Sequence, residues 1–485
     1  MSLKMVLISL FTLIFSSCQS DNGSDVATIV YVENIVIAGN NISSGTTGQL
    51  TATISPANAT DKSVTWSSSD TSIATISATG FITALKNGTI IVTATAKDEG
   101  AVKASKEIQI SNFPGTANNH LVINATELMA ALIKVKPGET ILMNGGTYVM
   151  NAKINITTSG TSDKPINLIV KDGQSRPKLD FSAMPENSAN QGIVLSANYW
   201  NIKGIDVFKA GDNGMQVKGS NNTIEFCTFS ECSDTGLQID NGASNNTILN
   251  CDSYFNADST IENADGFACK LNAGTGNKFI GCRAWQNLDD GWDGYLRGTD
   301  NITTTYQNCW AIKNGYLKNG TKGNGDGNGF KTGGSDDKLL KHNAIYTNCI
   351  ATANVFDGFD HNSNRGEVVI YNCSSYSNGI NYSFSNSNPL GKLTIKNSNT
   401  FGAYGSANAT VVDVTNNSWQ DGIVVSSADF KSIDYVELLA SRKADGGLPD
   451  VNFFHLNASS KLIDKGVNIG LPFKGVAPDL GAFEY

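Results

Sequence analysis

The feature that most constrains the fold is a repeat in the middle of the chain, where a glycine opens a short apolar, strand-like segment. Successive glycines lie 22, 30, 25, 38 and 29 residues apart, at Gly214, Gly236, Gly266, Gly291, Gly329 and Gly358. Asparagine-rich turns recur between them, as at 221–224 and 245–248. A drifting period of this size is typical of a β-solenoid, in which each coil leaves an apolar face that only the next coil can bury. A β-propeller is the alternative, but it needs a stricter period and a more uniform blade signature.

The composition agrees with an all-β chain. Glycine accounts for 48 of the 485 residues, and charged residues make up only 16%. Exposed helical faces usually carry many lysines and glutamates, and glycine is a turn residue that weakens helix interiors. The composition therefore excludes a coiled coil, a helical bundle and a collagen. The formal net charge of −9 argues against nucleic acid as a partner, because its phosphates demand a basic surface.

Six of the nine cysteines occur at one phase of the repeat, each directly after an apolar strand-like run. They are Cys227, Cys251, Cys282, Cys309, Cys349 and Cys373. One cysteine per coil predicts a buried stack of small apolar side chains. Exported proteins can form disulfides, but we predict free core thiols here. No Cys-x-x-Cys or Cys/His spacing supports a zinc site.

The N-terminus carries the pattern of an export signal. In residues 1–17 one lysine precedes a short apolar run that ends in small residues. The run is shorter than the ~20 residues of a transmembrane helix. The segment Phe15-Ser16-Ser17-Cys18 resembles a bacterial lipobox, which implies that Cys18 is lipidated and that residues 18–25 tether the protein to the outer membrane. We therefore expect an exported cell-surface lipoprotein; the alternative is a plain signal peptide and a secreted protein.

The next segment, residues 26–111, consists of short alternating runs rich in Thr, Ser, Val and Ile, which predict a small β-sandwich. Its stretches 54–77 and 80–96 resemble bacterial immunoglobulin-like domains of group 2, with Trp66 as the core aromatic residue. We find no chemistry in this domain and interpret it as a spacer. Carbohydrate adhesion is the alternative role.

The repeat domain begins after a linker that we place at 112–119, and it covers 120–485. Residues 126–133 have helical spacing and a Thr126 cap. We expect this helix to cover the open end of the solenoid core.

Acidic residues gather at one phase of two neighbouring coils. Stacked coils place equivalent residues about one strand spacing (~4.8 Å) apart, which brings Asp265 beside Asp289 or Asp290. Asp293 follows a short turn later. Four carboxylates this close repel one another unless a cation lies among them, and a set of hard oxygen ligands selects Ca²⁺ over zinc or copper. Turn formation by Asp-Gly is the alternative, and it leaves Asp289 and Asp293 unexplained.

Lys331 occupies the same phase of the repeat, in the segment Gly329-Phe330-Lys331. We therefore expect it on the face that carries the aspartates. A lysine beside a divalent cation loses proton affinity and can then act as a general base. A solvated surface lysine, or an electrostatic anchor for substrate, is the alternative, and residue type alone favours it.

The pattern of Asp265, Asp289-Asp290 and Asp293 followed by Gly329-Phe330-Lys331 resembles the family 9 polysaccharide lyases. The resemblance covers about 118–485 and includes the segments at 126–128, 145–148 and 477–484. It implies a right-handed parallel β-helix, a Ca²⁺ ion held by the four aspartates, and Lys331 as the general base. The 38-residue interval between Asp293 and Lys331 leaves Lys322 and Lys338 as rival matches.

The resemblance further implies an acidic plant cell-wall polysaccharide as substrate, cleaved by β-elimination to a 4,5-unsaturated product. Pectate is the first choice and the rhamnogalacturonan I backbone the second, and we expect a monomer that binds no nucleic acid. Candidates for binding substrate carboxylates are Arg283, Arg297, Lys313 and Lys322. Candidates for stacking on sugar rings are Trp292 and Tyr295, with Trp285 and Trp310 as further aromatic residues.

Two other functions fit the same solenoid. A glycoside hydrolase could use Asp289 and Asp290 as an acid–base pair, although the Gly-His-Gly and Arg-Ile-Lys segments of β-helix polygalacturonases are missing. A non-catalytic surface adhesin could hold a purely structural calcium ion. Product absorbance separates a lyase from a hydrolase, and loss of turnover on replacing Lys331 separates a lyase from an adhesin.

Overall fold

The computed structural model describes residues 29–42, 46–98, 100–111 and 119–485. The described residues form two compact units, one within 29–109 except residue 46, and the other within 110–485 together with residue 46. The predicted signal, tether and lipidation residue Cys18 lie outside the described residues, as does most of the predicted linker. Among the described residues, none of the helices combines the length and the apolar character of a membrane span.

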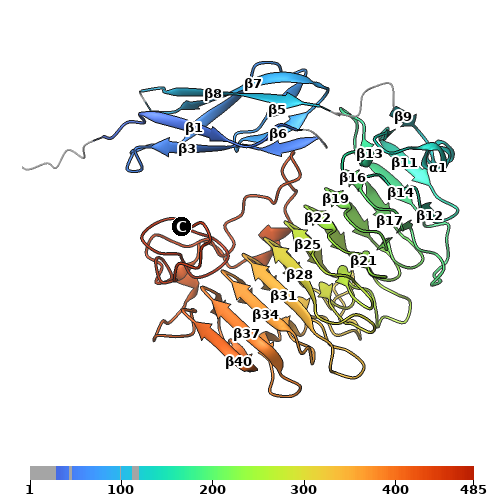
Figure 1. The fold of residues 1–485 in the computed structure, drawn as a ribbon. Coiled ribbons are helices and arrows are strands. Elements are labelled where there is room, and N and C mark those ends of the chain that lie inside the picture. The colour runs from blue at the N-terminus through green and yellow to red at the C-terminus, as the bar shows by residue number, and fades with distance from the viewer. Residues whose placement is uncertain (1–28, 43–45, 99, 112–118) are drawn as a thin grey trace, which may run out of the picture. The chain divides into compact units, whose positions relative to one another are not determined.

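The first unit is built from short antiparallel strands (blue in Figure 1). They pair as β1 (Asn34–Ala38) with β3 (Thr51–Ser55); as β2 (Thr47–Gln49), β6 (Phe81–Ala84) and β5 (Ala74–Ile76); and as β4 (Val64–Ser68), β7 (Gly88–Ala96) and β8 (Lys103–Ile110). Alternation along β7 buries Ala94 and Ala96 and leaves Thr95 between them half-buried. Half-buried Trp66 packs against this core. The predicted immunoglobulin-like sandwich is confirmed.

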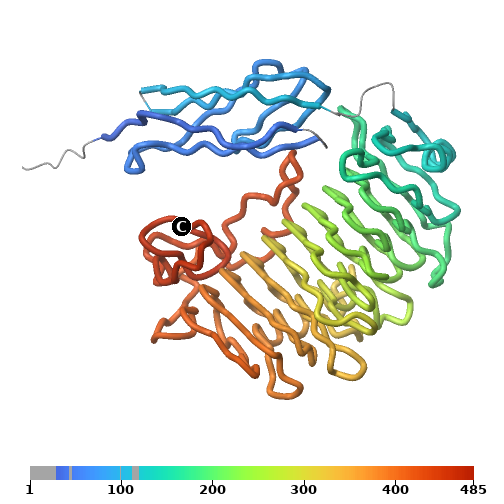
Figure 2. Tube along the Cα trace, viewed as in Figure 1, coloured from blue at the N-terminus to red at the C-terminus, as the bar shows by residue number. Residues whose placement is uncertain are grey.

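The second unit winds through three parallel sheets, one strand of each per coil, as Figure 2 shows by the steady colour change along the coils. Sheet A contains β9 (Asn119–Val122), β10 (Thr140–Met143), β13 (Ile166–Val170), β16 (Trp200–Lys203), β19 (Thr223–Glu225), β22 (Thr247–Leu249), β25 (Asn277–Ile280), β28 (Ile302–Gln307), β31 (His342–Thr347), β34 (Glu367–Tyr371), β37 (Leu390–Lys396) and β40 (Ala409–Thr415).

The other two sheets have ten strands each. Sheet B contains β11 (Gly146–Val149), β14 (Pro177–Asp180), β17 (Asp206–Phe208), β20 (Thr228–Ser230), β23 (Asp252–Tyr254), β26 (Arg283–Trp285), β29 (Trp310–Ile312), β32 (Ile350–Thr352), β35 (Ser374–Tyr376) and β38 (Asn399–Phe401). Sheet C contains β12 (Ile154–Ile156), β15 (Ile193–Leu195), β18 (Met215–Val217), β21 (Leu237–Ile239), β24 (Phe267–Cys269), β27 (Trp292–Asp293), β30 (Phe330–Lys331), β33 (Asp357–Asp360), β36 (Ile380–Phe384) and β39 (Gly405–Ala407). The predicted all-β fold, a parallel β-helix, is confirmed.

In-register stacking fills the core with columns of like side chains. One aromatic column runs along sheet C with ring centroids 4.8–5.3 Å apart, through Phe267, Trp292, Phe330, Phe359 and Tyr382. The six phased cysteines are buried and free, and their thiols donate to backbone carbonyls such as that of Ile202. The prediction of core thiols is confirmed.

An asparagine ladder turns the chain from sheet B to sheet C in successive coils. Each side-chain amide donates to the side-chain oxygen of the asparagine in the next coil, through Asn256, Asn287, Asn314, Asn354 and Asn378. The residues directly before them have φ of 48–59°, the left-handed region in which the chain turns sharply. The ladder satisfies buried amides that would otherwise cost free energy.

The first coil and the outer face of sheet B are covered by other segments of the chain. Helix α1 (Ala125–Lys134) buries Leu128, Ala131 and Leu132 against the first coil, as predicted, but its N-cap is Asn124 rather than Thr126. The C-terminal segment contains the short 3₁₀ helices η2 (Ser427–Asp429) and η3 (Tyr435–Leu439) and packs along the outer face of sheet B (brown-red in Figure 1).

Candidate functional site

The candidate site lies on the outer face of sheet C, at β24, β27 and β30. The parallel register aligns Ala268 with Asp293, and Asp293 with Lys331. Because side chains alternate along a strand, the preceding residues Trp292 and Phe330 point into the core, and Asp293 and Lys331 point outward. The phase that the sequence predicted for Lys331 is confirmed.

Three carboxylates meet in the loops that lead into these strands. Asp265, Asp289 and Asp290 each offer an oxygen within 4.8 Å of the others. Asp265 and Asp290 are fully buried, and Asp289 is partly buried. The backbone N–H of Asp290 donates to Asp265 Oδ1 at 3.3 Å. Stacking of neighbouring coils thus places the predicted aspartates together, with buried Asp293 on the adjoining strand.

The carboxylates are oriented by neighbouring polar groups. Asn328 donates from its backbone N–H and its side-chain amide to Asp290 Oδ1, at 2.8 and 2.9 Å. Thr235 Oγ1 donates to Asp265 Oδ2 at 3.0 Å. Asp290 Oδ2 is buried without a hydrogen bond and faces Lys331 Nζ at 3.1 Å. This oxygen is therefore directed into the cluster, where the Lys331 ammonium is its positive neighbour.

Two lysines reach the cluster from opposite sides. Lys331 Nζ lies 3.1 Å from Asp290 and 3.0 Å from the exposed Asp326. Lys270 Nζ lies 2.6 Å from Asp265 and 3.3 Å from Asp293. The sequence analysis missed Lys270. Strand alternation supplies a signal that could have found it, because Lys270 follows Ala268 by two residues on the outward phase.

Burial and mutual repulsion shift the pKa values of the carboxylates apart. Burial raises the pKa of Asp290 well above its usual range, and the charge of Asp289 raises it further. Burial and the charge of Asp265 raise the pKa of Asp289 to about 7. Burial also acts on Asp293, but the ammonium groups of Lys331 and Lys270 outweigh it and hold its pKa below the usual range.

The pKa of Lys331 shifts in the opposite sense to that expected beside a bound cation. Burial alone lowers the pKa of Lys331, but the carboxylates of Asp290 and Asp293 outweigh burial and raise it well above its usual value. The difference has a physical reason, because the carboxylates around the amine favour its charged form. The cluster therefore holds more negative charge than its lysines balance.

The donor set fits a hard divalent cation. Asp265, Asp289 and Asp290 contribute only carboxylate oxygens, and calcium takes six to eight oxygen ligands. Asp290 Oδ2 accepts no hydrogen bond and is oriented toward positive charge, because Lys331 Nζ lies 3.1 Å from it. The cluster could therefore bind a metal ion.

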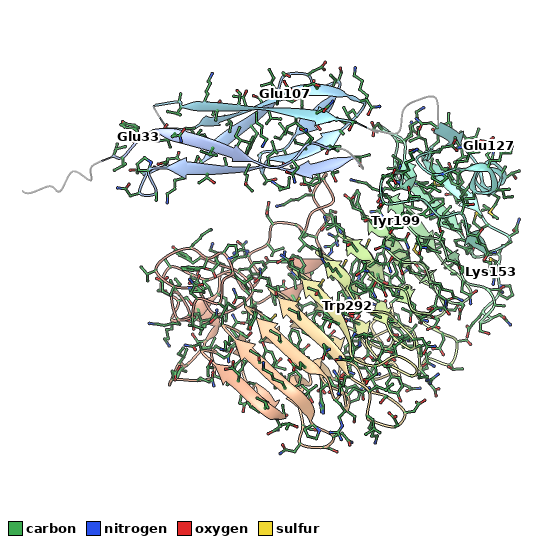
Figure 3. All side chains as sticks on the ribbon, viewed as in Figure 1. Glu33, Glu107, Glu127, Lys153, Tyr199 and Trp292 are labelled. Carbon is green, nitrogen blue, oxygen red and sulfur yellow. The ribbon has the colours of Figure 1, made fainter. Side chains whose placement is uncertain are left out.

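Two predicted substrate contacts are wrong. Trp292 (labelled in Figure 3) is 1% exposed and stacks between Phe267 and Phe330 in the core, so it cannot contact a sugar. Arg283 is 3% exposed on sheet B and forms a buried two-bond pair with Asp252, joined by Arg442 of the C-terminal segment. Arg283 therefore has a structural role: it joins sheet B to the C-terminal segment. The further aromatic residues Trp285 and Trp310 also pack against that segment.

The remaining predicted substrate contacts stay predictions. Tyr295 lies next to the cluster, since its N–H donates to Asp293 Oδ1 at 3.0 Å, and its hydroxyl donates to Asp336. Arg297 is exposed and lies 3.5 Å from Asp336. Lys313 and Lys322 belong to the loop between β29 and β30. Lys313 Nζ lies 5.6 Å from the ring centroid of Tyr316, and Lys322 Nζ lies 4.7 Å from that of Phe356.

Replacing Trp292 by alanine is expected to destabilise the protein by about 3–5 kcal/mol, because it opens a cavity in the aromatic column. Chemical denaturation followed by fluorescence measures the loss. Tyr295→Ala is the matched control on the outer face, where a loss below about 1 kcal/mol is expected. Equal losses for the two variants would contradict the assignment of Trp292 to the core.

Comparison with known proteins agrees with this fold. Residues 110–400 match a family described as "Pel9A-like, right handed beta helix region", and 34–108 match the group 2 bacterial Ig-like domain. Pectate lyase L of Dickeya dadantii is 36% identical over 82% of this chain and 96% of its own length. Pectate lyase L of Paenibacillus polymyxa is 37% identical over 76% of this chain and 85% of its own length.

Two solved structures have the same architecture. The crystal structure of pectate lyase Pel9A is 38% identical, with a TM-score of 0.67 over 73% of this chain and 90% of that one. A rhamnogalacturonan lyase is 28% identical, with a TM-score of 0.62 over 69% of this chain and 91% of that one. The chain belongs to the Pel9A-like right-handed β-helix family, and it is a polysaccharide lyase.

Proposed function

We propose that this lyase cleaves galacturonic-acid polymers of the pectate type by β-elimination, with calcium held by Asp265, Asp289, Asp290 and Asp293 and with Lys331 as the base. The observation that carries the proposal is the position of Lys331, whose amine lies 3.1 Å from a buried carboxylate of the cluster. The pectate lyase relatives support this substrate. A rhamnogalacturonan I backbone is the second candidate, supported by the solved rhamnogalacturonan lyase.

The chemical difficulty of the reaction is the removal of the C5 proton of a uronic acid, next to a carboxylate whose negative charge opposes a carbanion. A cation held by the four aspartates supplies the positive charge that offsets this carboxylate. The aspartates themselves are kept in place by Asn328 and Thr235, whose hydrogen bonds orient them. Such supporting hydrogen bonds commonly set the affinity of a metal site.

Lys331 performs the proton transfer in this scheme. Its neutral amine takes the proton from C5, the C5–H electron pair forms the C4–C5 double bond, and the C4–O4 bond breaks with O4 as the leaving group. No water is consumed, which distinguishes the product from that of a hydrolase. Lys331 is restrained by Asp290 and Asp326, so its amine is held in one place, as a general base requires.

An assay on two polymers tests the proposal. The purified full chain, incubated with polygalacturonate and calcium, is expected to release a product with the ultraviolet absorbance of an unsaturated uronide. Rhamnogalacturonan I is the parallel substrate, and the ratio of the two rates identifies the preferred backbone. New reducing ends without absorbance would instead identify a hydrolase, and the absence of either signal on both polymers would overturn the substrate assignment.

Export and lipidation at Cys18, with attachment to the bacterial outer membrane, stay predictions of the sequence, as does the monomeric state.

A further inference from the structure

Lys270 is a partly buried lysine of the cluster that the proposed reaction does not use. It directly follows β24, and only 17% of its side chain is exposed. Its amine lies 2.6 Å from Asp265 Oδ2 and 3.3 Å from Asp293 Oδ2. It therefore joins one carboxylate from the loop before β24 to another on the next strand, and both carboxylates belong to the proposed calcium ligands.

The charges of the cluster give this lysine a specific consequence. Four aspartates face two lysines, Lys270 and Lys331, which leaves an excess of two negative charges when all the groups are ionised. One divalent cation balances that excess. Asp326 contacts Lys331, and Asp360 is aligned with it on β33; both add negative charge outside the cluster. Without Lys270 the loaded cluster would carry one further negative charge beside an acidic substrate.

Lys270 also occupies oxygen atoms that a metal ion needs. Asp265 Oδ2 already accepts hydrogen bonds from Thr235 and Lys270. A cation that binds this oxygen meets the ammonium either as a competitor for the lone pairs or as a like charge at close range. Both effects weaken cation binding. In the ion-free protein, the same contact holds Asp265 and Asp293 together against their repulsion.

We propose that Lys270 is an internal counter-ion that lowers the calcium affinity of the cluster and reduces the negative charge of the loaded site, so that an acidic polymer is accepted. This inference rests on the proposed calcium site. It assigns Lys270 a positioning and charge-balancing role, and it leaves proton transfer to Lys331.

Calorimetric titration of the metal-stripped full chain with calcium chloride tests the role without any measurement of turnover. Lys270→Met removes the charge and keeps most of the volume, and its calcium Kd is expected to fall at least tenfold below that of the parent protein. Lys270→Arg keeps the charge, and its Kd is expected to stay within about threefold of the parent value. Lys278→Met removes the charge of an exposed lysine on β25 of sheet A, and it is expected to leave the Kd unchanged.

The possible results separate the two proposals. A parent protein that takes up no calcium overturns the proposed calcium site itself. A parent that binds calcium, with Lys270→Met binding equally or more weakly, overturns the role of Lys270 alone. Circular dichroism checks that the ion-free variant is folded; if Lys270→Met is not, Lys270→Gln, which keeps a hydrogen-bond donor, carries the same expectation. A second readout is KM for polygalacturonate at saturating calcium, which is expected to rise in Lys270→Met.

Discussion

Lys331→Ala is expected to lower kcat on polygalacturonate by about 10²–10⁴-fold, the range that a positioned general base contributes. The amine lies beside the buried carboxylate of Asp290, on the strand next to Asp293. A water molecule in the space that the side chain leaves would not have the basicity of the amine at that position. The initial rate of the rise in product absorbance at saturating calcium measures the effect.

Two controls separate loss of the base from loss of the site. Lys338→Ala removes the rival lysine of the loop between β30 and β31, and it is expected to turn over at the parent rate. Calcium binding by Lys331→Ala is expected to persist, because the aspartates remain and one positive charge has gone. Turnover of Lys331→Ala at the parent rate would show that another group takes the proton.

The pH profile gives the same assignment an independent check. The carboxylates hold the pKa of Lys331 above its usual value in the ion-free protein. The base must be neutral, so its active fraction grows as pH rises toward that pKa, and activity is expected to increase into the alkaline range. A bound cation offsets the carboxylates, so saturating calcium is expected to move the rising limb to lower pH. A rate that falls above neutral pH in stable protein would argue against a lysine base.

Asp290→Asn is expected to have the second-largest effect, raising the calcium Kd by about a hundredfold or more. Loss of a supporting hydrogen bond already costs about 10–100-fold in metal affinity, and Asp290 is itself a fully buried member of the donor set. The amide keeps an oxygen that can accept from Asn328, so the loop should stay folded. Calorimetry measures the Kd, and turnover at low calcium measures its consequence.

Asp300→Asn provides the matched control, because Asp300 is an exposed carboxylate on the loop after β27 that accepts a hydrogen bond from the backbone N–H of Lys341. Its calcium Kd is expected to equal that of the parent. A chelator should abolish turnover of the parent, and excess calcium should restore it. An unchanged Kd for Asp290→Asn would remove this residue from the proposed ligands.

The sequence predicted those features that depend on the stacking period. Successive coils lie in register, so residues separated by one period become neighbours, and a sequence interval translates directly into proximity. Asp265 and Asp290 are found together in the structure for this reason, as are the phased cysteines. Its phase in the repeat likewise predicted that Lys331 lies on the face of the aspartates, as the register of Asp293 with Lys331 shows.

The sequence did not reveal which side chains outside this pattern are available to a substrate. Trp292 and Tyr295 are close in sequence, yet Trp292 lies inside the aromatic column, and Tyr295 is partly exposed. The sequence analysis offered Trp292 for sugar stacking, because an aromatic residue beside an acidic cluster suits that role. Only the packing of Trp292 between two rings excludes that role.

The sequence alone determined the coil, the turns and the phase of the acidic cluster, because each depends on spacing within one or two coils. Tertiary structure decided the roles of Arg283 and Lys270. Arg283 is not available to a substrate, because it contacts a segment about 160 residues away in the sequence. One of these contacts is a hydrogen bond of 2.7 Å to the backbone carbonyl of Ala440. Lys270 is drawn to two carboxylates that converge only when neighbouring coils stack. A buried charge takes the partner that surrounds it in space, and no local pattern in the chain specifies that partner.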